Sequence, residues 1–451
     1  MIELNDYLNR NIPCPCGKTH FSSVKLVDIG PEAVKRLPEH IRNLGYKKVF
    51  IVADQNTWRA AGASAAFELE AGGIRFEKII LEHKEVVPDE TVIGELMTAF
   101  PLDTDLVLAV GSGTINDLCK FISHRMRTDY IIFASAPSMD GFVSTGAALM
   151  LRHVKTTLNC HGPEAVIGDT AILSAAPMNL IAAGMGDTLG KYTCLLDWKI
   201  SHIVNGEYYC GEVAGMVETA LKTVNEQHEK VLMRDPSAIK ALTEALILTG
   251  VAMSFIGNSR PASGCEHHLS HYWEMKSLMA GKSPALHGAQ VGVGLILCLR
   301  LYHQLSEQIP DFENDGLRVF NYFDWKNRMK QYYGAAANEI IALETKARKN
   351  DPSARSKRLA VIRDNWGKIC HLIHTSLPET ETMEKLLQSF NAPINPSQIG
   401  ISGNDVYSAV IAAKEVRDRY TLLQLLWDLG LSEQYAEDAR KYFASQQSVH
   451  N

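Results

Sequence analysis

The chain has 451 residues, which is too long for one ordinary hydrophobic core and predicts two domains. Hydrophobic residues make up 46% and charged residues 21%, a composition typical of globular proteins. The formal net charge of -6 gives no reason to expect a general affinity for nucleic acid.

The nine cysteines are odd in number and mostly scattered, which argues against a disulfide framework and for a reducing compartment. The first ten residues mix acids, Asn and Arg, unlike a secretory signal. We expect the longest apolar stretches, such as residues 291–301, to be too short to span a bilayer. We therefore expect a cytoplasmic protein without a membrane span.

Strand-like and helix-like segments alternate in the first part of the chain. Such alternation predicts a parallel α/β sheet. Continuous apolar runs indicate the buried strands of this sheet. We expect strands at residues 48–54, 75–81, 105–110 and 130–134, and helices at residues 56–71 and 89–100.

From about residue 177 the apolar residues recur at helical spacing, and convincing strands are absent. We place a domain boundary near residues 170–177. The prediction is a Rossmann-like α/β domain at 1–175 and an all-α domain at 176–451. The expected helices of the second domain include residues 241–256, 291–305, 325–345, 356–376 and 406–429.

A glycine turn joins the third expected strand to a helix. Glycines let the backbone approach a diphosphate closely, and the N-terminus of the following helix offers N–H groups to an anion. The pattern is not GxGxxG, so a purely structural turn is the alternative. The residues of the turn and the first helical turn are Gly111, Ser112, Gly113, Thr114, Ile115, Asn116 and Asp117.

Two other strand ends carry polar residues. Asp54 can bind a ribose and disfavour NADP, or it can cap the next helix. A loop from Ser135 to Ser144 follows the fourth strand, where ligands of parallel sheets bind. Ser144 is a candidate nucleotide contact and Asp140 a candidate substrate contact. The alternative is a turn held by Pro, Asp and Gly.

Asp187 lies in an expected helix that also contains Gly184 and Gly186. Each glycine destabilises a helix by up to about 1 kcal/mol relative to alanine. Their presence therefore suggests close approach by a ligand or by another backbone segment.

Three histidines further along the chain extend this pattern. His267 and His271 are four residues apart and share a helix face, and His287 follows. One aspartate with two histidines would hold a divalent metal and leave coordination positions open for substrate oxygens. His268 is a rival ligand, but it points about 100° away from His267, so we expect it to be a structural residue.

The segment CPCGKTH at residues 14–20 resembles a metal knuckle. No second cysteine pair follows at zinc-ribbon spacing, so a complete structural zinc site is not expected there.

Residues 24–301 resemble the sn-glycerol-1-phosphate dehydrogenases, in the superfamily of iron-containing alcohol dehydrogenase, glycerol dehydrogenase and dehydroquinate synthase. The most specific segments are RPASGCEHHLSH at 260–271 and ASAPSMDG at 134–141. The resemblance implies a dehydroquinate synthase-like fold. Two features depart from it: the helical region beyond residue 320 is long, and Cys265 replaces an expected small residue.

The resemblance also implies the roles of individual residues. The metal, zinc or nickel, would be bound by Asp187, His267 and His287, and the substrate would face Asp140, Asp187 and His271. The nicotinamide dinucleotide, NAD or NADP, would face Asp54, the turn at 111–117, Ser135, Ala136, Pro137, Ser138 and Ser144.

The implied reaction is the reversible reduction of dihydroxyacetone phosphate to sn-glycerol 1-phosphate, a step in phospholipid metabolism. The expected partner is then a small molecule, the phosphorylated triose. We also expect the chain to form a homo-oligomer such as a homodimer. Three alternatives remain open: a polyol dehydrogenase with the same metal site, a dehydroquinate-synthase-like cyclase, and a catalytically silent binding protein.

Overall fold

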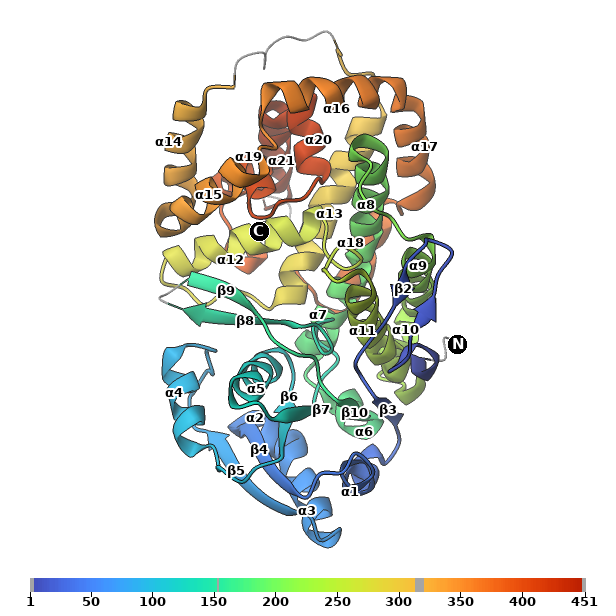
Figure 1. The fold of residues 1–451 in the computed structure, drawn as a ribbon. Helices are drawn as coiled ribbons and strands as arrows, with labels where there is room; N and C mark the ends of the chain where they lie inside the picture. Colours follow the sequence, from blue (N-terminus) through green and yellow to red (C-terminus); the bar gives the residue numbers. More distant parts are fainter. Residues whose placement is uncertain (1–3, 152–153, 313–319, 448–451) are drawn as a thin grey trace. The chain divides into compact units, whose positions relative to one another are not determined.

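The computed structural model describes residues 4–151, 154–312 and 320–447. The chain divides into two compact units, coloured along the sequence in Figure 1. The sheet unit comprises Met1–Thr188 and Glu212–Ser259, and the helical unit comprises Leu189–Gly211 and Arg260–Asn451.

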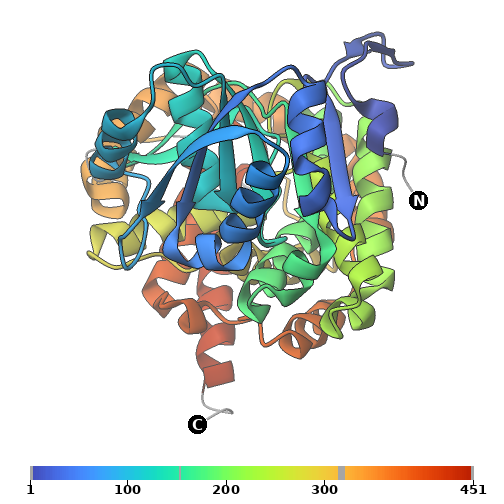
Figure 2. The ribbon, with the colours of Figure 1, turned by 90° about the horizontal axis from the view of Figure 1, so that it is seen from below.

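The sheet unit contains a parallel sheet of six strands in the order β3-β10-β7-β6-β4-β5 (Figure 2). The central strands are buried on both faces, as their continuous Val, Ile and Leu runs predict. The strands are β3 (Leu26–Gly30), β4 (Lys48–Asp54), β5 (Arg75–Leu81), β6 (Leu106–Gly111), β7 (Asp129–Ala134) and β10 (Ala165–Asp169).

Helices connect the strands and complete the sheet unit. They are α1 (Ala33–Asn43), α2 (Gln55–Thr57), the π-helical η2 (Trp58–Gly62), α3 (Ala63–Ala71), α4 (Glu90–Ala99), α5 (Gly113–Met126), α6 (Thr170–Ala175), α7 (Met178–Leu189), α9 (Gly211–Glu226), α10 (His228–Leu232) and α11 (Pro236–Ile256). The short 3-10 helix η1 (Leu4–Tyr7) and two antiparallel hairpins also belong to this unit: β1 (Ile12–Pro13) with β2 (Thr19–His20), and β8 (Gly146–Leu151) with β9 (Val154–Asn159).

The helical unit has no strand among its described residues. Its helices are α8 (Lys191–Asn205), α12 (Cys265–Met279), α13 (His287–Ser306), α14 (Tyr322–Tyr333), η3 (Gly334–Ala336), α15 (Ala337–Ala347), α16 (Pro352–Asp364), α17 (Trp366–Ser376), α18 (Thr380–Ser389), η4 (Pro396–Ile399), α19 (Gly403–Ala412), η5 (Ala413–Glu415), α20 (Leu422–Asp428) and α21 (Ser432–Gln447).

The structure confirms the predicted fold class and all four predicted strands, and it adds β3 and β10 to the sheet. Three predicted helices are interrupted. The helix at 325–345 breaks at Gly334, whose φ of 49° is left-handed, and that at 356–376 breaks at Asn365. The helix at 406–429 ends at Ala412 and resumes at Leu422. The functional domain limits, 1–175 and 176–451, stay a prediction.

The prediction that every apolar stretch is too short to span a membrane is wrong for α11. This helix has 21 residues and is long and apolar enough by composition alone. Of its most apolar window, 67% is buried within the protein, as in the core helix of a globular domain.

Two glycines let the loop after β7 lie directly against α7 and α11. A Cβ at Gly184 would stand 1.8 Å from the Pro137 carbonyl oxygen, and a Cβ at Gly250 would stand 2.3 Å from the Val143 side chain. The close approach that the glycines of α7 suggested is therefore that of another backbone segment. This packing fixes residues 137–143 beside Asp187.

We expect Gly184→Ala to lower the melting temperature by roughly 5–10 °C, because the added methyl group displaces a buried backbone segment. Gly94→Ala is the matched control: Gly94 is an exposed glycine of α4, and a Cβ added there would meet nothing within 4 Å. Alanine at this position should leave the melting temperature unchanged or raise it by about 2 °C. Differential scanning calorimetry compares the two, and equal melting temperatures would contradict the packing account.

Candidate functional site

The strand order places the glycine turn at a topological switch point of the sheet. β4 connects to β5 on one side, whereas the neighbouring β6 connects to β7 on the other. Ligands of open α/β sheets bind in the crevice that such divergent connections leave at the carboxyl ends of the strands. Asp54 ends β4 and Gly111 ends β6, so both predicted residues lie at this edge.

The turn after β6 is shaped by close packing of its own helix. A Cβ at Gly111 would lie 2.6 Å from the Ile115 side chain, so glycine lets α5 start directly above the strand. The turn is joined to the loop after β7, since Ser135 N donates to the Gly111 carbonyl at 2.9 Å. Ser112 also shares a hydroxyl–hydroxyl hydrogen bond with Ser138. The two predicted nucleotide segments therefore form one continuous surface.

Asp54 acts as a helix cap in the structure. Its Oδ1 accepts hydrogen bonds at 2.8 Å from Asn56 N and Thr57 N, in a capping box. A carboxylate has two oxygens, so this role leaves ribose binding chemically compatible. The two functions proposed for Asp54 from the sequence need not compete.

Lys120 was missed in the sequence analysis. Its fully buried ammonium donates to Asp117, to the Gly141 and Gly146 carbonyls, and to the Ser144 hydroxyl, at 3.0–3.2 Å. This lysine ties the loop after β7 to α5. The signal was present as a lysine three residues after Asp117, but helix spacing alone reads it as a surface pair.

Asp187 is fully buried in α7, and its Oδ2 accepts a hydrogen bond from Asp140 N at 2.9 Å. Asp140 is itself 7% exposed. The two aspartates predicted to face the substrate are therefore neighbours within the sheet unit.

Three predicted histidines gather in the helical unit, where α12 and α13 cross. The His267 and His287 ring centroids are 5.1 Å apart, and the His271 ring lies 6.3 Å and 6.0 Å from these two. Gly294 permits the crossing, because a Cβ there would stand 2.7 Å from the Glu266 carbonyl oxygen. The spacing argument for His267 and His271 on one helix face is confirmed.

Glu266 orients His267 and was not recognised from the sequence. Its buried Oε1 lies 2.8 Å from His267 Nδ1, with the proton on the ring nitrogen, and accepts from Gly264 N at 2.8 Å. Its Oε2 accepts from the Thr193 hydroxyl at 2.7 Å. Burial acts to raise the pKa of Glu266, but these hydrogen bonds together hold it below its usual value. Nε2 of His267 is then the nitrogen that carries a lone pair.

A second buried acidic side chain, Asp197, lies close enough to Glu266 to interact with its charge. Asp197 of α8 accepts hydrogen bonds from Cys265 N, from Leu422 N and from the Tyr302 hydroxyl. Burial, followed by the charge of Glu266, raises the pKa of Asp197 to about 7. The Asp197 side chain thus joins four helices, and its contact with Cys265 N lies at the start of α12.

Cys265 and His268 belong to the core. Burial raises the pKa of the Cys265 thiol to about 11, so the thiol without a metal is neutral at neutral pH. His268 is fully buried, and burial together with Arg419 holds its pKa well below the usual value. His267, which Glu266 orients, is therefore preferred over His268 as a candidate ligand.

His271 lies between opposite charges. Arg417 Nη2 is 3.3 Å from His271 Nε2, and Glu274 Oε2 is 3.7 Å from Nδ1. This arrangement favours the tautomer with its proton on Nδ1, so that Nε2 accepts from the guanidinium. Arg417 comes from residues 413–421, which the sequence resemblance did not reach.

Arg419 adds a second guanidinium beside the first turn of α12, donating to the Ser263 carbonyl at 3.0 Å. Burial, then the charges of Arg417 and Arg260, lowers the pKa of Arg419 to about 9. Arg260 itself is buried and bonded to Glu207 and to the Tyr420 carbonyl at 2.8 Å. Arg417 therefore contacts His271 directly, and Arg419 lies beside the start of α12.

Residues 28–177 match the family model described as iron-containing alcohol dehydrogenase. Among solved structures, glycerol dehydrogenase from Schizosaccharomyces pombe is 14% identical with a TM-score of 0.60, over 94% of this chain and 92% of that one. A 1,3-propanediol oxidoreductase is 16% identical with a TM-score of 0.60, over 91% and 98%. At this identity the likeness establishes the fold alone.

Curated relatives match at higher identity over nearly the whole chain. Glycerol-1-phosphate dehydrogenase [NAD(P)+] of Halalkalibacterium halodurans is 34% identical over 92% of this chain and 95% of the relative. The protein of the same name from Geobacillus stearothermophilus is 35% identical over 92% and 96%. With this identity across both chains, and with the aspartate and histidine clusters in place, the chain belongs to the glycerol-1-phosphate dehydrogenase family.

Proposed function

We propose that this protein catalyses the reversible NAD(P)H-linked reduction of dihydroxyacetone phosphate to sn-glycerol 1-phosphate. The hydride of NADH or NADPH goes to the ketone carbon and a proton goes to its oxygen, leaving NAD+ or NADP+ and the secondary alcohol. The observation that carries the proposal is the identity above 30%, over more than 90% of the chain, to relatives named for this activity.

We assign the divalent metal to Asp187, His267 and His287. The fit rests on the chemistry of the donors, a buried carboxylate and two imidazoles, and on the Glu266 hydrogen bond that leaves the His267 Nε2 lone pair available. When bound, the metal supplies Lewis-acid stabilisation of the negative charge that develops on the substrate oxygen. The donor set accepts both zinc and nickel.

The dinucleotide is assigned to the switch point of the sheet. The pyrophosphate would lie on the turn at 111–117, whose helix N-terminus attracts anions. The nicotinamide half would meet the loop at 135–138 and Ser144, and Asp54 would bind the adenosine ribose. The hydrogen bonds that join these segments into one surface support a single extended ligand.

The substrate is assigned to Asp140, Asp187 and His271. Asp140 and Asp187 would orient the hydroxyl groups, and His271 would hold or deliver the proton at the reacting oxygen. Arg417 and Arg419 would bind the phosphate, because two partly buried guanidiniums favour a dianion. Arg260 and Lys191 fit this role less well, since both are buried at 1% exposure.

We also expect a cytoplasmic location and a homodimer. In that setting the product serves as a precursor of phospholipids. Two rivals share the fold: a polyol dehydrogenase that needs no phosphate, and a cyclase that recycles its NAD. The paired arginines favour a phosphorylated substrate over a simple polyol.

The activity is tested by following NADH oxidation with dihydroxyacetone phosphate or dihydroxyacetone, on enzyme reconstituted with zinc or nickel. We expect stoichiometric oxidation with the phosphorylated ketone and a preference of at least about 100-fold in kcat/KM, equivalent to ~2.7 kcal/mol. Chiral analysis should give the sn-1 enantiomer. A preference for dihydroxyacetone would indicate a polyol dehydrogenase, and no net oxidation with either ketone would favour the cyclase.

We expect Arg417→Ala to lower kcat/KM for dihydroxyacetone phosphate roughly 10- to 100-fold, through loss of a charge-assisted hydrogen bond. The slow reaction with dihydroxyacetone should be unchanged. Arg348→Ala is the matched control, since Arg348 lies in the same unit but is exposed and pairs with Asp351 at 2.7 Å. Equal losses with both ketones would mean that Arg417 acts through His271 and not on the phosphate.

We expect Asp54→Asn to raise the ratio of kcat/KM for NADPH over NADH about 10-fold, because the charge that repels a 2′-phosphate is removed. Asparagine caps helices as well as aspartate does, so α2 should keep its start. Asp89→Asn makes the same exchange at the cap of α4, where Asp89 accepts from Thr91 N and Val92 N. It should leave the ratio unaltered, and an unaltered ratio in Asp54→Asn would remove Asp54 from the cofactor site.

A further inference from the structure

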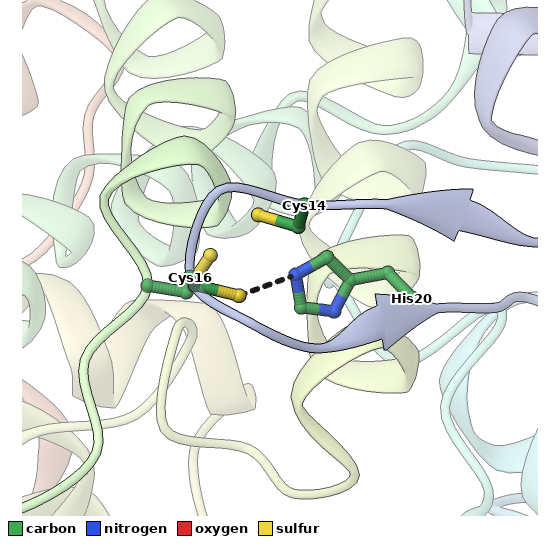
Figure 3. A group of neighbouring side chains, drawn as sticks. Cys14, Cys16 and His20 are labelled. Carbon is green, nitrogen blue, oxygen red and sulfur yellow. Dashed lines mark hydrogen bonds between the residues drawn. The ribbon is translucent and has the colours of Figure 1, made fainter.

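The N-terminal hairpin holds three metal-binding side chains that the proposed reaction does not use. Cys14 and Cys16 lie in the turn between β1 and β2, and His20 ends β2. Gly17 allows the tight turn with a φ of +85°, and Cys14 N donates to the Lys18 carbonyl at 3.0 Å. Figure 3 shows the three side chains pointing toward one another.

The distances suit a tetrahedral ion. The two sulfurs and the imidazole nitrogen all lie within 4.8 Å of one another, and Cys16 Sγ is 3.5 Å from His20 Nε2. With Zn–S near 2.3 Å and Zn–N near 2.1 Å, a tetrahedral zinc separates a sulfur and a nitrogen ligand by about 3.6 Å. A thiol hydrogen bond would give a similar separation, so the remaining observations decide between the two.

His20 is held in the orientation that a metal ligand requires. Its Nδ1 lies 3.0 Å from the Phe255 carbonyl oxygen, and its ring stacks on the Phe255 ring at 5.3 Å and 12°. Donation from Nδ1–H to a carbonyl fixes the tautomer and leaves the Nε2 lone pair toward the cysteines. The side chain is also 2% exposed, so its position is set by α11 and not by solvent.

The hairpin itself needs an additional source of stability. Each strand has two residues, and the register contains only two residue pairs. A hairpin of this size is unstable in water unless packing or a covalent or metal link supports it. Ile12 is half-buried and Pro13 exposed, so little apolar surface is available from its own strands.

We propose that Cys14, Cys16 and His20 bind a structural zinc ion. Two sulfurs and one nitrogen are donors that structural zinc sites use. The site is independent of the proposed reaction.

The sequence predicts no complete structural zinc site here, because no second cysteine pair follows nearby. The contacts of His20 with Phe255 orient a third ligand toward the two cysteines, which the spacing alone does not show. All nine cysteines are described, and none forms a disulfide.

The test compares zinc bound per full-length chain in the wild type, Cys16→Ser and Cys370→Ser, measured by plasma mass spectrometry after dialysis. Cys370 is a half-buried cysteine of α17 and serves as the matched control. We expect Cys16→Ser to bind one equivalent less than the wild type and to have a lower melting temperature. Cys370→Ser should bind as much as the wild type. Equal zinc in all three proteins would overturn the proposal.

A second measurement serves if Cys16→Ser does not fold. His287→Ala, which lacks a proposed ligand of the other metal, is loaded with zinc and studied by X-ray absorption. We expect the remaining zinc to show sulfur neighbours near 2.3 Å. Zinc with only nitrogen and oxygen neighbours, or no retained zinc, would overturn the hairpin site. Neither result depends on enzymatic activity, so failure here is distinguishable from failure of the proposed reaction.

Discussion

The hydrogen bond from His267 to the buried carboxylate of Glu266 is the interaction on which the candidate site depends. Burying a carboxylate is costly unless its oxygens are satisfied, and Glu266 meets this condition with a backbone N–H, a hydroxyl and an imidazole. The same three contacts join α8, the start of α12 and the candidate ligand. Removing the carboxylate would therefore disturb the histidine and the helix together.

In the sheet unit, close backbone packing holds the loop after β7 beside Asp187. Gly184 and Gly250 admit the loop after β7, and Lys120 ties the loop to α5. These contacts bring Asp140 N to the carboxylate of Asp187. Each unit thus presents its proposed catalytic groups from a rigid local framework, which is what positioning of a metal and a hydride acceptor requires.

Much of the sheet and part of the candidate site could be predicted from the sequence, because long apolar runs and a glycine turn are strong local signals. The strands at residues 48–54 and 75–81 appear as expected, and the i,i+4 spacing of His267 and His271 gave their shared face. β10 was missed because its apolar run has only three residues, 165–167, before Gly168. Glu266 was missed because residues adjacent in a helix normally point about 100° apart.

The arginines near His271 were missed for another reason. Arg417 is 146 residues away in sequence from the histidine it contacts, so only tertiary structure brings the two together. The hairpin ligands show the converse: the cysteine spacing was noticed, but His20 could not be oriented until its contact with Phe255 was seen. In the hairpin, local patterns suggested the residue types, whereas packing determined which atoms are presented.

The most direct test of the account is a crystal structure of the zinc-loaded enzyme with NAD, with anomalous diffraction recorded on both sides of the zinc edge. The account predicts a peak bonded to the Asp187 carboxylate, His267 Nε2 and His287 at about 2.0–2.2 Å, with Glu266 still bonded to His267 Nδ1. A fully active crystal with no metal peak at Asp187, His267 and His287, or with that peak on His268, would contradict it.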